Sequence, residues 1–295
     1  MMGSVDLPQF IVAGLSSGAL YALMALGFTI VFASTGVINF AQGEFYMLGG
    51  MISVVSLSVL GVPLVFALLI GIVATTLVGV AFELLAIRPR KDGDPLALII
   101  ITVGGSILIQ SLTRHAVGGE ELATLPDFSP GPSIVIAGVT IVRQALWLWG
   151  IMVMAVVALT FLYRRTRFGK AMRACSIDRD GARLVGIGTA RVVTASFALA
   201  ATLGALAGAA TAPTIPPVFY SGAGVGLKGF AAAILGGLGN PVAAVAGGLL
   251  LGLIENIASG FISSTYKDGI ALVVLLGVLF VRPQGLFGGK GREKL

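Results

Sequence analysis

Uncharged stretches long enough to cross a lipid bilayer make up most of this chain. Residues 7–43 contain no charged side chain, and neither do 45–82, 95–113, 144–163, 192–227, 229–254 and 269–281. A helix that crosses the hydrocarbon core needs about 20 predominantly apolar residues. Soluble domains are about one quarter charged, whereas only 11% of this chain is charged. The pattern predicts an all-α, polytopic helical membrane protein and excludes a soluble globular domain.

Basic residues gather at the edges of the apolar stretches. Fifteen of the 19 lysines and arginines lie in residues 88–91, 164–191 and 282–294, whereas the connection 113–144 carries three acidic and two basic residues. Loops rich in Lys and Arg stay in the cytoplasm, so we expect these three segments, and with them the C-terminus, to be cytoplasmic and 113–144 to be external. Basic residues sorted in this way do not form a nucleic-acid-binding face, despite the net charge of +6. No nucleic acid is expected as a partner.

Six membrane helices are expected before residue 213. Their approximate ranges are 10–32, two within 45–87 on either side of a Gly-Val-Pro turn, 96–112, 145–162 and 192–212. Because Arg191 and Arg282 are both expected in the cytoplasm, an even number of crossings must separate them. Three apolar stretches lie between these two arginines, so one of the three cannot be a simple crossing.

A broken helix in the C-terminal half resolves this mismatch. Gly236-Gly237-Leu238-Gly239-Asn240-Pro241 interrupts the middle stretch, which predicts a short inward half-helix at 228–235, a re-entrant turn, an outward helix to about residue 260 and a return at 270–281. The total is then about eight or nine spans. Broken helices mark substrate sites in transporters, so Gly236, Gly237 and Asn240 are candidate pathway residues. The alternative is that one stretch lies in the membrane interface and no helix is broken.

A second interruption lies at residues 34–45, which join two apolar runs without a basic residue. Asn39, Gln42 and Glu44 are its polar members. A carboxylate at the bilayer centre costs about 2.5–3.5 kcal/mol and therefore usually faces protein or water, which favours a place in the pathway or its gate. The other interpretation is a cytoplasmic turn in which Asn39 caps the next helix and Glu44 lies favourably at that helix's N-terminal dipole.

The residues needed for catalysis or metal binding are scarce. His115 is the single histidine and Cys175 the single cysteine, so we expect no metal site, no disulfide and no Ser/His/Asp set. The phosphate-binding pattern G-x-x-x-x-G-K-[ST] does not occur. We expect no cofactor, no enzymatic activity and no ATP site of this type in the chain. The glycine pairs at 14 and 18, 204 and 208, and 248 and 252 are typical of closely packed membrane helices.

The cytoplasmic connection 163–191 is longer than a hairpin between two membrane helices needs. Between Gly169 and Gly186, small residues fall roughly on one side of a predicted helix, and charged residues fall on the other. Alanine and cysteine are poor anchors for lipid but suit close contact with protein, which favours a docking surface for a partner. The alternatives are a helix lying on lipid or a simple linker.

Six segments together resemble the permease subunits of branched-chain amino-acid ABC importers, LivH type. They are the glycine-rich run 18–29, Ile38-Asn39-Phe40-Ala41-Gln42-Gly43-Glu44, the loop 169–187, the run 228–239, Tyr266-Lys267-Asp268 and the ending 282–288. The resemblance extends from about residue 10 to 289, in order and at matching spacing. Gln42 stands where the family usually has histidine, and residues 176–181 are less helix-favouring than the usual loop.

This resemblance implies a single transmembrane permease domain, 1–295, in the bacterial cytoplasmic (inner) membrane. The chain would form half of a pathway through membrane lipid with a second, related permease subunit. Two ATP-binding subunits would dock on the coupling loop at 163–191, and an extracytoplasmic solute-binding protein would deliver the substrate. The residues that this implies for the coupling loop are Gly169, Arg173, Ala174, Ala182, Leu184, Gly186 and Ile187.

Three classes of function therefore remain for this sequence. The first is a permease subunit of an ATP-driven importer, for branched-chain amino acids or, alternatively, for urea, short amides or aromatic acids. The second is an ion-coupled secondary transporter, for which Glu44, Glu83 and Glu255 are the acidic candidates. We interpret Glu83 as a local ion pair with Arg88 and Glu255 as a water-accessible residue near the outer end of its helix. The third class is a membrane subunit without a pathway.

Overall fold

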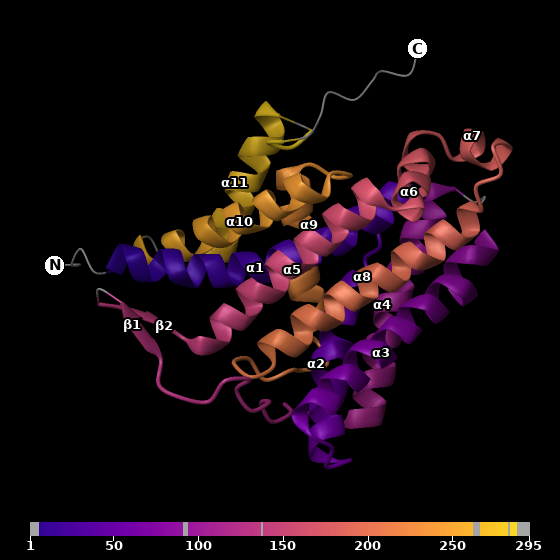
Figure 1. Cartoon of the computed structure of the whole chain (residues 1–295). Coiled ribbons are helices and arrows are strands. Elements are labelled where there is room, and N and C mark those ends of the chain that lie inside the picture. Colours follow the sequence, from indigo (N-terminus) through magenta and orange to yellow (C-terminus); the bar gives the residue numbers. More distant parts are fainter. Residues whose placement is uncertain (1–5, 91–93, 137, 262–265, 283, 288–295) are drawn as a thin grey trace.

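Helices dominate the computed structural model, which describes residues 6–90, 94–136, 138–261, 266–282 and 284–287 (Figure 1). The helices are α1 (Asp6–Thr35), α2 (Gln42–Ser58), α3 (Leu64–Phe82), α4 (Pro95–Val117), α5 (Arg143–Arg165), α6 (Arg167–Ile177), α7 (Arg179–Leu184), α8 (Thr189–Thr211), α9 (Ser221–Gly236), α10 (Pro241–Phe261) and α11 (Lys267–Val281). A π-helical turn, η1 (Glu83–Ile87), and a 3-10 turn, η2 (Arg88–Arg90), extend α3.

Six helices among the described residues are long and apolar enough to cross a membrane. They are Leu7–Thr35, Leu64–Arg90, Pro95–Val117, Arg143–Arg165, Thr189–Thr211 and Pro241–Phe261, and two shorter apolar helices cover Ser221–Gly236 and Leu272–Val281. This confirms the prediction of a polytopic helical membrane protein. The basic residues at 288–295, expected to be cytoplasmic, lie outside the described part of the chain.

A two-stranded hairpin and the short helices α6 and α7 lie at opposite ends of the helix bundle (Figure 1). The hairpin pairs β1 (Ile134–Ile136) with β2 (Val139–Ile141) in antiparallel register, Ile134 opposite Ile141. The sequence interpretation did not include it. Helix α5 begins just after the hairpin and ends just before α6, so its 23 residues span about 35 Å between the two ends.

Helix α1 occupies the centre and packs on α5, α6, α8, α9 and α10. Its closest partner is α10, which runs antiparallel to it: a Cβ atom at Gly14 would lie 2.9 Å from the Leu253 Cα, and one at Gly18 would lie 2.9 Å from the Leu249 Cα. From the other side, a Cβ atom at Gly248 would lie 2.5 Å from the Ala22 backbone nitrogen. Glycine is required here because the two backbones leave no room for a side chain, as the spacing of the glycines predicted.

The break between α1 and α2 returns the chain to the middle of the bundle. Gln42, the first residue of α2, reaches the carbonyl of Ala200, which lies 11 residues, or about 16 Å, along α8 from Thr189. Residues 36–41 are therefore non-helical at this depth. Non-helical backbone needs partners from protein there, and the Phe40 amide donates to the Thr102 hydroxyl of α4 at 3.2 Å.

The predicted broken helix in the C-terminal half is present. Helix α9 ends at Gly236, the turn follows with φ of 124° at Gly237 and 92° at Gly239, and α10 begins at Pro241. The amides of Leu286 and Phe287 donate to the carbonyls of Leu235 and Gly236, which joins the end of the described chain to this turn.

The expected start of that half-helix at residue 228 was wrong. Helix α9 begins seven residues earlier, at Ser221, just after the proline-containing segment 213–217. Glycine normally weakens a helix, but Gly222 and Gly226 lie directly against Gly43 at the start of α2. Close packing, which the local sequence does not reveal, supports this first turn of α9.

The α1–α10 contact generates a stability prediction. Replacing Gly248 with Val places two methyl groups against the Ala22 backbone, which cannot move as a side chain would. Overpacking costs roughly 1–3 kcal/mol, so we expect a lower thermal midpoint and a larger aggregated fraction in detergent size-exclusion chromatography. Gly104→Val in α4 is the matched control, because a Cβ atom there meets nothing within 4 Å. Equal behaviour of the two variants would contradict this packing.

Candidate functional site

The polar residues at the start of α2 form a fully buried group. Asn39 is 1% exposed, and Gln42 and Glu44 are 0% exposed. The Gln42 amide nitrogen donates to the Ala200 carbonyl at 2.9 Å, while its side chain passes close to Gly27 of α1. Gln42 thus joins α1, α2 and α8, and Gly27 leaves the space that its side chain fills.

Glu44 is the charged member of this group. The Ser106 hydroxyl of α4 donates to its Oε1 atom at 2.8 Å. No donor in the described part of the chain bonds its Oε2 atom, and a Cβ atom added at Gly222 of α9 would lie 2.7 Å from that oxygen. The carboxylate therefore lies among α2, α4 and α9, where the first turns of α2 and α9 meet.

Asn39 supports the turn before α2. Its Oδ1 atom accepts from the Ala41 amide at 3.1 Å, and the helix N-cap itself is Ala41, which provides no side-chain bond. The second sequence interpretation, in which Asn39 caps the next helix, was wrong on this point, because Asn39 bonds the amide of the N-cap residue Ala41 and no amide within α2. Asn39 Nδ2 and Gln42 Oε1 have no partner among the described residues, so this group retains unused hydrogen-bonding capacity.

The turn residues Gly236, Gly237 and Asn240 are not part of this group. Glu44 lies near Gly222 at the start of α9, whereas Gly236 ends the same helix 14 residues later, about 20 Å away. The Asn240 side chain accepts from the amides of Val242 and Ala243 and so caps α10. The six pathway candidates form two groups at opposite ends of α9.

A third polar group, not predicted from the sequence, joins α1, α9 and α10. Lys228 Nζ lies 2.8 Å from Glu255 Oε1, and the Tyr21 hydroxyl donates to Glu255 Oε2 at 2.7 Å. The expectation that Glu255 is water-accessible was wrong, because Glu255 is only 3% exposed. The signal was present in the sequence: Lys228 is the only charged residue in 192–254, and Glu255 the only one in 229–266.

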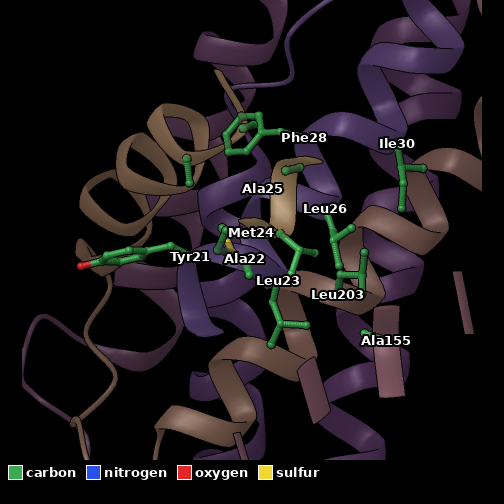
Figure 2. Close-up of a cluster of buried hydrophobic side chains, with 14 of the residues drawn as sticks. Tyr21, Ala22, Leu23, Met24, Ala25, Leu26, Phe28, Ile30, Ala155 and Leu203 are labelled. Carbon is green, nitrogen blue, oxygen red and sulfur yellow. The ribbon is translucent and has the colours of Figure 1, made fainter. Parts of the chain in front are cut away.

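A cavity of about 510 Å³ opens beside this ion pair. It is lined by Gly224, Leu227, Lys228, Phe230, Ala231, Leu251, Glu255, Leu272 and Leu275. Tyr21 points toward this side of α1, away from the packed Leu23 and Leu26 (Figure 2). The cavity therefore combines apolar walls from α9, α10 and α11 with one positive and one negative side chain.

The connection 163–191 forms two short helices in place of the single helix predicted. Helix α6 ends at Ile177 and α7 begins at Arg179, within the stretch 176–181 that disfavours helix. Gly169 lies inside α6, where its amide donates to the Thr166 hydroxyl, and not ahead of the helix as expected. Gly186, with φ of 82°, follows the end of α7 as predicted.

The small side chains of this connection pack inward. Gly169, Cys175 and Ala182 are buried, and α6 contacts α1, α5 and α8. The expectation that the small face is free for a partner was wrong at these positions, because they hold the connection onto its own bundle. Among the residues implied for the coupling loop, Arg173, Leu184 and Gly186 are exposed, whereas Ala174 and Ile187 are half-buried. The apolar Ile177 and Val185 and the polar Lys170, Ser176, Asp178 and Arg183 are exposed on the same segment.

Glu83 and Arg88 form the expected local ion pair, with Nε and Oε1 3.3 Å apart. The π-helical turn brings the residue five positions later over Glu83, and the Thr194 hydroxyl of α8 donates to Glu83 Oε2 at 2.8 Å. Among the residues that the structure describes, no group of three or more His, Cys, Asp or Glu side chains is arranged to hold a metal ion.

The chain is similar along almost its whole length to permease proteins. Residues 10–279 match the family described as branched-chain amino acid transport system / permease component. The high-affinity branched-chain amino acid transport system permease protein LivH of Escherichia coli (strain K12) is 36% identical over 96% of each chain, and BraD of Pseudomonas aeruginosa is 34% identical over 97% of each. The autoinducer 2 import system permease protein LsrC of Yersinia enterocolitica is 28% identical over 90% of this chain and 72% of its own. The protein belongs to the family of permease components of branched-chain amino acid transport systems.

Proposed function

We propose that this chain is the permease subunit of an ATP-driven ABC importer and forms half of a pathway for branched-chain amino acids. The main support is the similarity to LivH and BraD, which covers nearly all of both chains. The broken helices agree with it, because half-helices in transporters place polar groups at the depth of the substrate. The Lys/Arg-rich end of the bundle, where α6 and α7 lie, is assigned to the cytoplasm, together with the C-terminus.

The proposed arrangement in the bacterial inner membrane has nine spans or half-spans. Helices α2, α9 and α11 add to the six long helices, with α9 as the half-helix that enters and turns at Gly236–Asn240. A second, related permease subunit completes the pathway. Two ATP-binding subunits dock from the cytoplasm, and a solute-binding protein delivers substrate from the other side.

The coupling surface is assigned to the exposed part of α6 and α7. Leu184 is 89% exposed, and Ile177 and Val185 are also exposed, although all three are apolar. Exposed apolar side chains on a water-facing segment favour a protein-binding surface. Arg173 and Gly186 are exposed on the same segment, while Gly169 and Ala182 are buried against the bundle.

Substrate selection is assigned to the solute-binding protein and, within this chain, to the buried polar residues. Asn39, Gln42 and Glu44 are placed at the pathway where α2 and α9 begin, and Gly236, Gly237 and Asn240 at the turn that ends α9. Urea, short amides or aromatic acids are the alternative cargo, and LsrC, a more distant relative, carries the name of a different import system. An ion-coupled transporter would work without any ATP-binding partner.

Affinity purification from detergent-solubilised native membranes tests this function. Co-elution of a second permease and two ATP-binding polypeptides, followed by ATP-dependent leucine uptake in proteoliposomes with the binding protein, is the expected result. A chain that elutes alone and transports without ATP would overturn the proposal in favour of a secondary transporter. If the protein takes up urea or an aromatic acid with ATP but does not take up leucine, the proposed substrate is wrong and the importer function stands.

The coupling surface generates a second prediction. Leu184→Asp should weaken retention of the ATP-binding subunits by at least tenfold, because burial of one leucine contributes about 1.5–3 kcal/mol. The thermal midpoint of the variant chain should be unchanged, since this side chain is exposed. Val135→Asp, an exposed apolar residue on the hairpin at the opposite end, is the matched control and should co-elute normally. Full retention in Leu184→Asp would place docking elsewhere.

The buried polar group generates a third prediction. Glu44→Ala should lower ATP-dependent uptake by about tenfold or more, since hydrogen bonds to charged groups contribute about 1.5–3 kcal/mol. Asn39→Ala should lower it by a smaller factor, since a neutral hydrogen bond contributes about 0.5–1.5 kcal/mol. Ser53→Ala in the same helix α2 is the control, because this buried hydroxyl bonds only the carbonyl one turn earlier. Initial rates of radiolabelled leucine uptake provide the measurement. Rates equal to the wild type in both polar variants would remove this group from the pathway.

A further inference from the structure

The Lys228–Glu255 pair is unusual for its position. Its two members come from different helices, α9 and α10, and are each flanked by more than ten uncharged residues on both sides. The pair lies where α1, α9 and α10 meet, with the glutamate side chain 4% exposed and the lysine side chain 29% exposed. Ionisable residues among membrane helices are costly and are placed where they serve a function.

Stability alone does not account for such a pair. Removing two charges from water costs several kcal/mol for each ion, and two well-packed apolar residues are often at least as stable in the same place. The neighbouring side chains, Leu227, Leu251 and Leu275, are apolar, so an apolar pair would match its surroundings. The Tyr21 hydroxyl, 2.7 Å from Glu255 Oε2, adds a third polar group that fixes the carboxylate.

The chemistry of the cavity fits one class of solute. A zwitterionic α-amino acid carries a carboxylate and an ammonium group on the same carbon, and here an ammonium and a carboxylate lie 2.8 Å apart at the wall of a cavity of about 510 Å³. A cavity of this volume is within the range of small-molecule sites, which combine apolar walls with a few polar groups that fix orientation. The leucines and Phe230 offer those walls to a branched aliphatic side chain.

We propose that the cavity between α9, α10 and α11 is a site for zwitterionic amino acids, in which Lys228 binds the solute carboxylate and Glu255 its ammonium group. When the solute binds, its carboxylate and its ammonium group take the place of the contact between Lys228 and Glu255. Each protein charge therefore keeps a partner of opposite charge. Tyr21 acts as a positioning residue that holds Glu255 while Lys228 moves toward the solute. Leu227 and Leu272, both exposed, form the rim through which the solute enters.

This inference rests on the proposed function for its choice of solute, but its test needs neither the binding protein nor ATP. The thermal midpoint of the purified, detergent-solubilised protein, with whatever subunits co-elute, is measured at millimolar to tens of millimolar leucine, 4-methylpentanoate, 3-methylbutylamine and urea. A ligand that binds the folded state raises the midpoint. We expect leucine to raise it and the two analogues, each lacking one charged group, to raise it much less.

Two variants test the two assigned contacts separately. Lys228→Gln should abolish the preference for leucine over 3-methylbutylamine, which lacks the carboxylate. Glu255→Gln should abolish the preference for leucine over 4-methylpentanoate, which lacks the ammonium group. Glu83→Gln, which neutralises the ion pair with Arg88 elsewhere in the chain, is the matched control and should keep both preferences even if its midpoint falls. Tyr21→Phe should weaken leucine binding without changing which analogue is rejected.

The double variant Lys228→Met/Glu255→Met removes both charges together and therefore leaves no unpaired ion if a single variant fails to fold. It should fold and lose stabilisation by leucine. Stabilisation by leucine equal to the wild type in this variant, or equal stabilisation of the wild type by leucine and its analogues, would overturn the site. Failure of the importer proposal is recognised separately, by wild-type protein that purifies without ATP-binding subunits.

Discussion

Close contact between the backbones of α1 and α10 is the constraint on which the centre of this molecule depends. Glycines at 14, 18, 248 and 252 allow the two helices to cross without intervening side chains. Apolar burial provides no drive for helices to associate in lipid, so packing of this kind must supply it. The same contact sets the separation of Tyr21 and Glu255, whose side chains meet at 2.7 Å. Replacing the glycines would therefore disturb both the bundle and its ion pair.

The two broken segments depend on α1 in turn. Gly27 leaves the room that Gln42 occupies, and a Cβ atom at Gly229 in α9 would approach the Met24 side chain. Phe28 of α1 and Phe40 of the first break both pack on Phe230 of α9, with ring centroids 5.7 and 5.6 Å apart from it. Non-helical backbone at this depth survives because α1, α4 and α8 enclose it and provide hydrogen-bond partners. One central helix thus packs on the first break and on the middle of α9, which leads to the second.

Features that follow from local sequence patterns could be predicted from the sequence. Features that depend on tertiary contacts between distant segments could not. Charge-free length and glycine spacing predicted the membrane helices, the two breaks and the close-packed helix faces, because each is a local property. The early start of α9 at Ser221 depends on Gly43, nearly 180 residues away, and could not be seen locally. The inward orientation of Ala182 has the same origin, since small residues pack equally well on a partner or on their own chain.

Glu83 and Glu255 show how far the environments of two similar carboxylates could be predicted from the sequence alone. Glu83 has its partner five residues away, just after the π-helical turn that Glu83 begins, so the local sequence was sufficient to assign its ion pair. Glu255 has its partners 27 and 234 residues away, and its expected position near the outer end of a helix suggested the wrong environment. A charge isolated in an apolar stretch must find its partner through the fold. The identity of that partner, and hence the paired charges in the cavity, emerges only when α1, α9 and α10 are assembled.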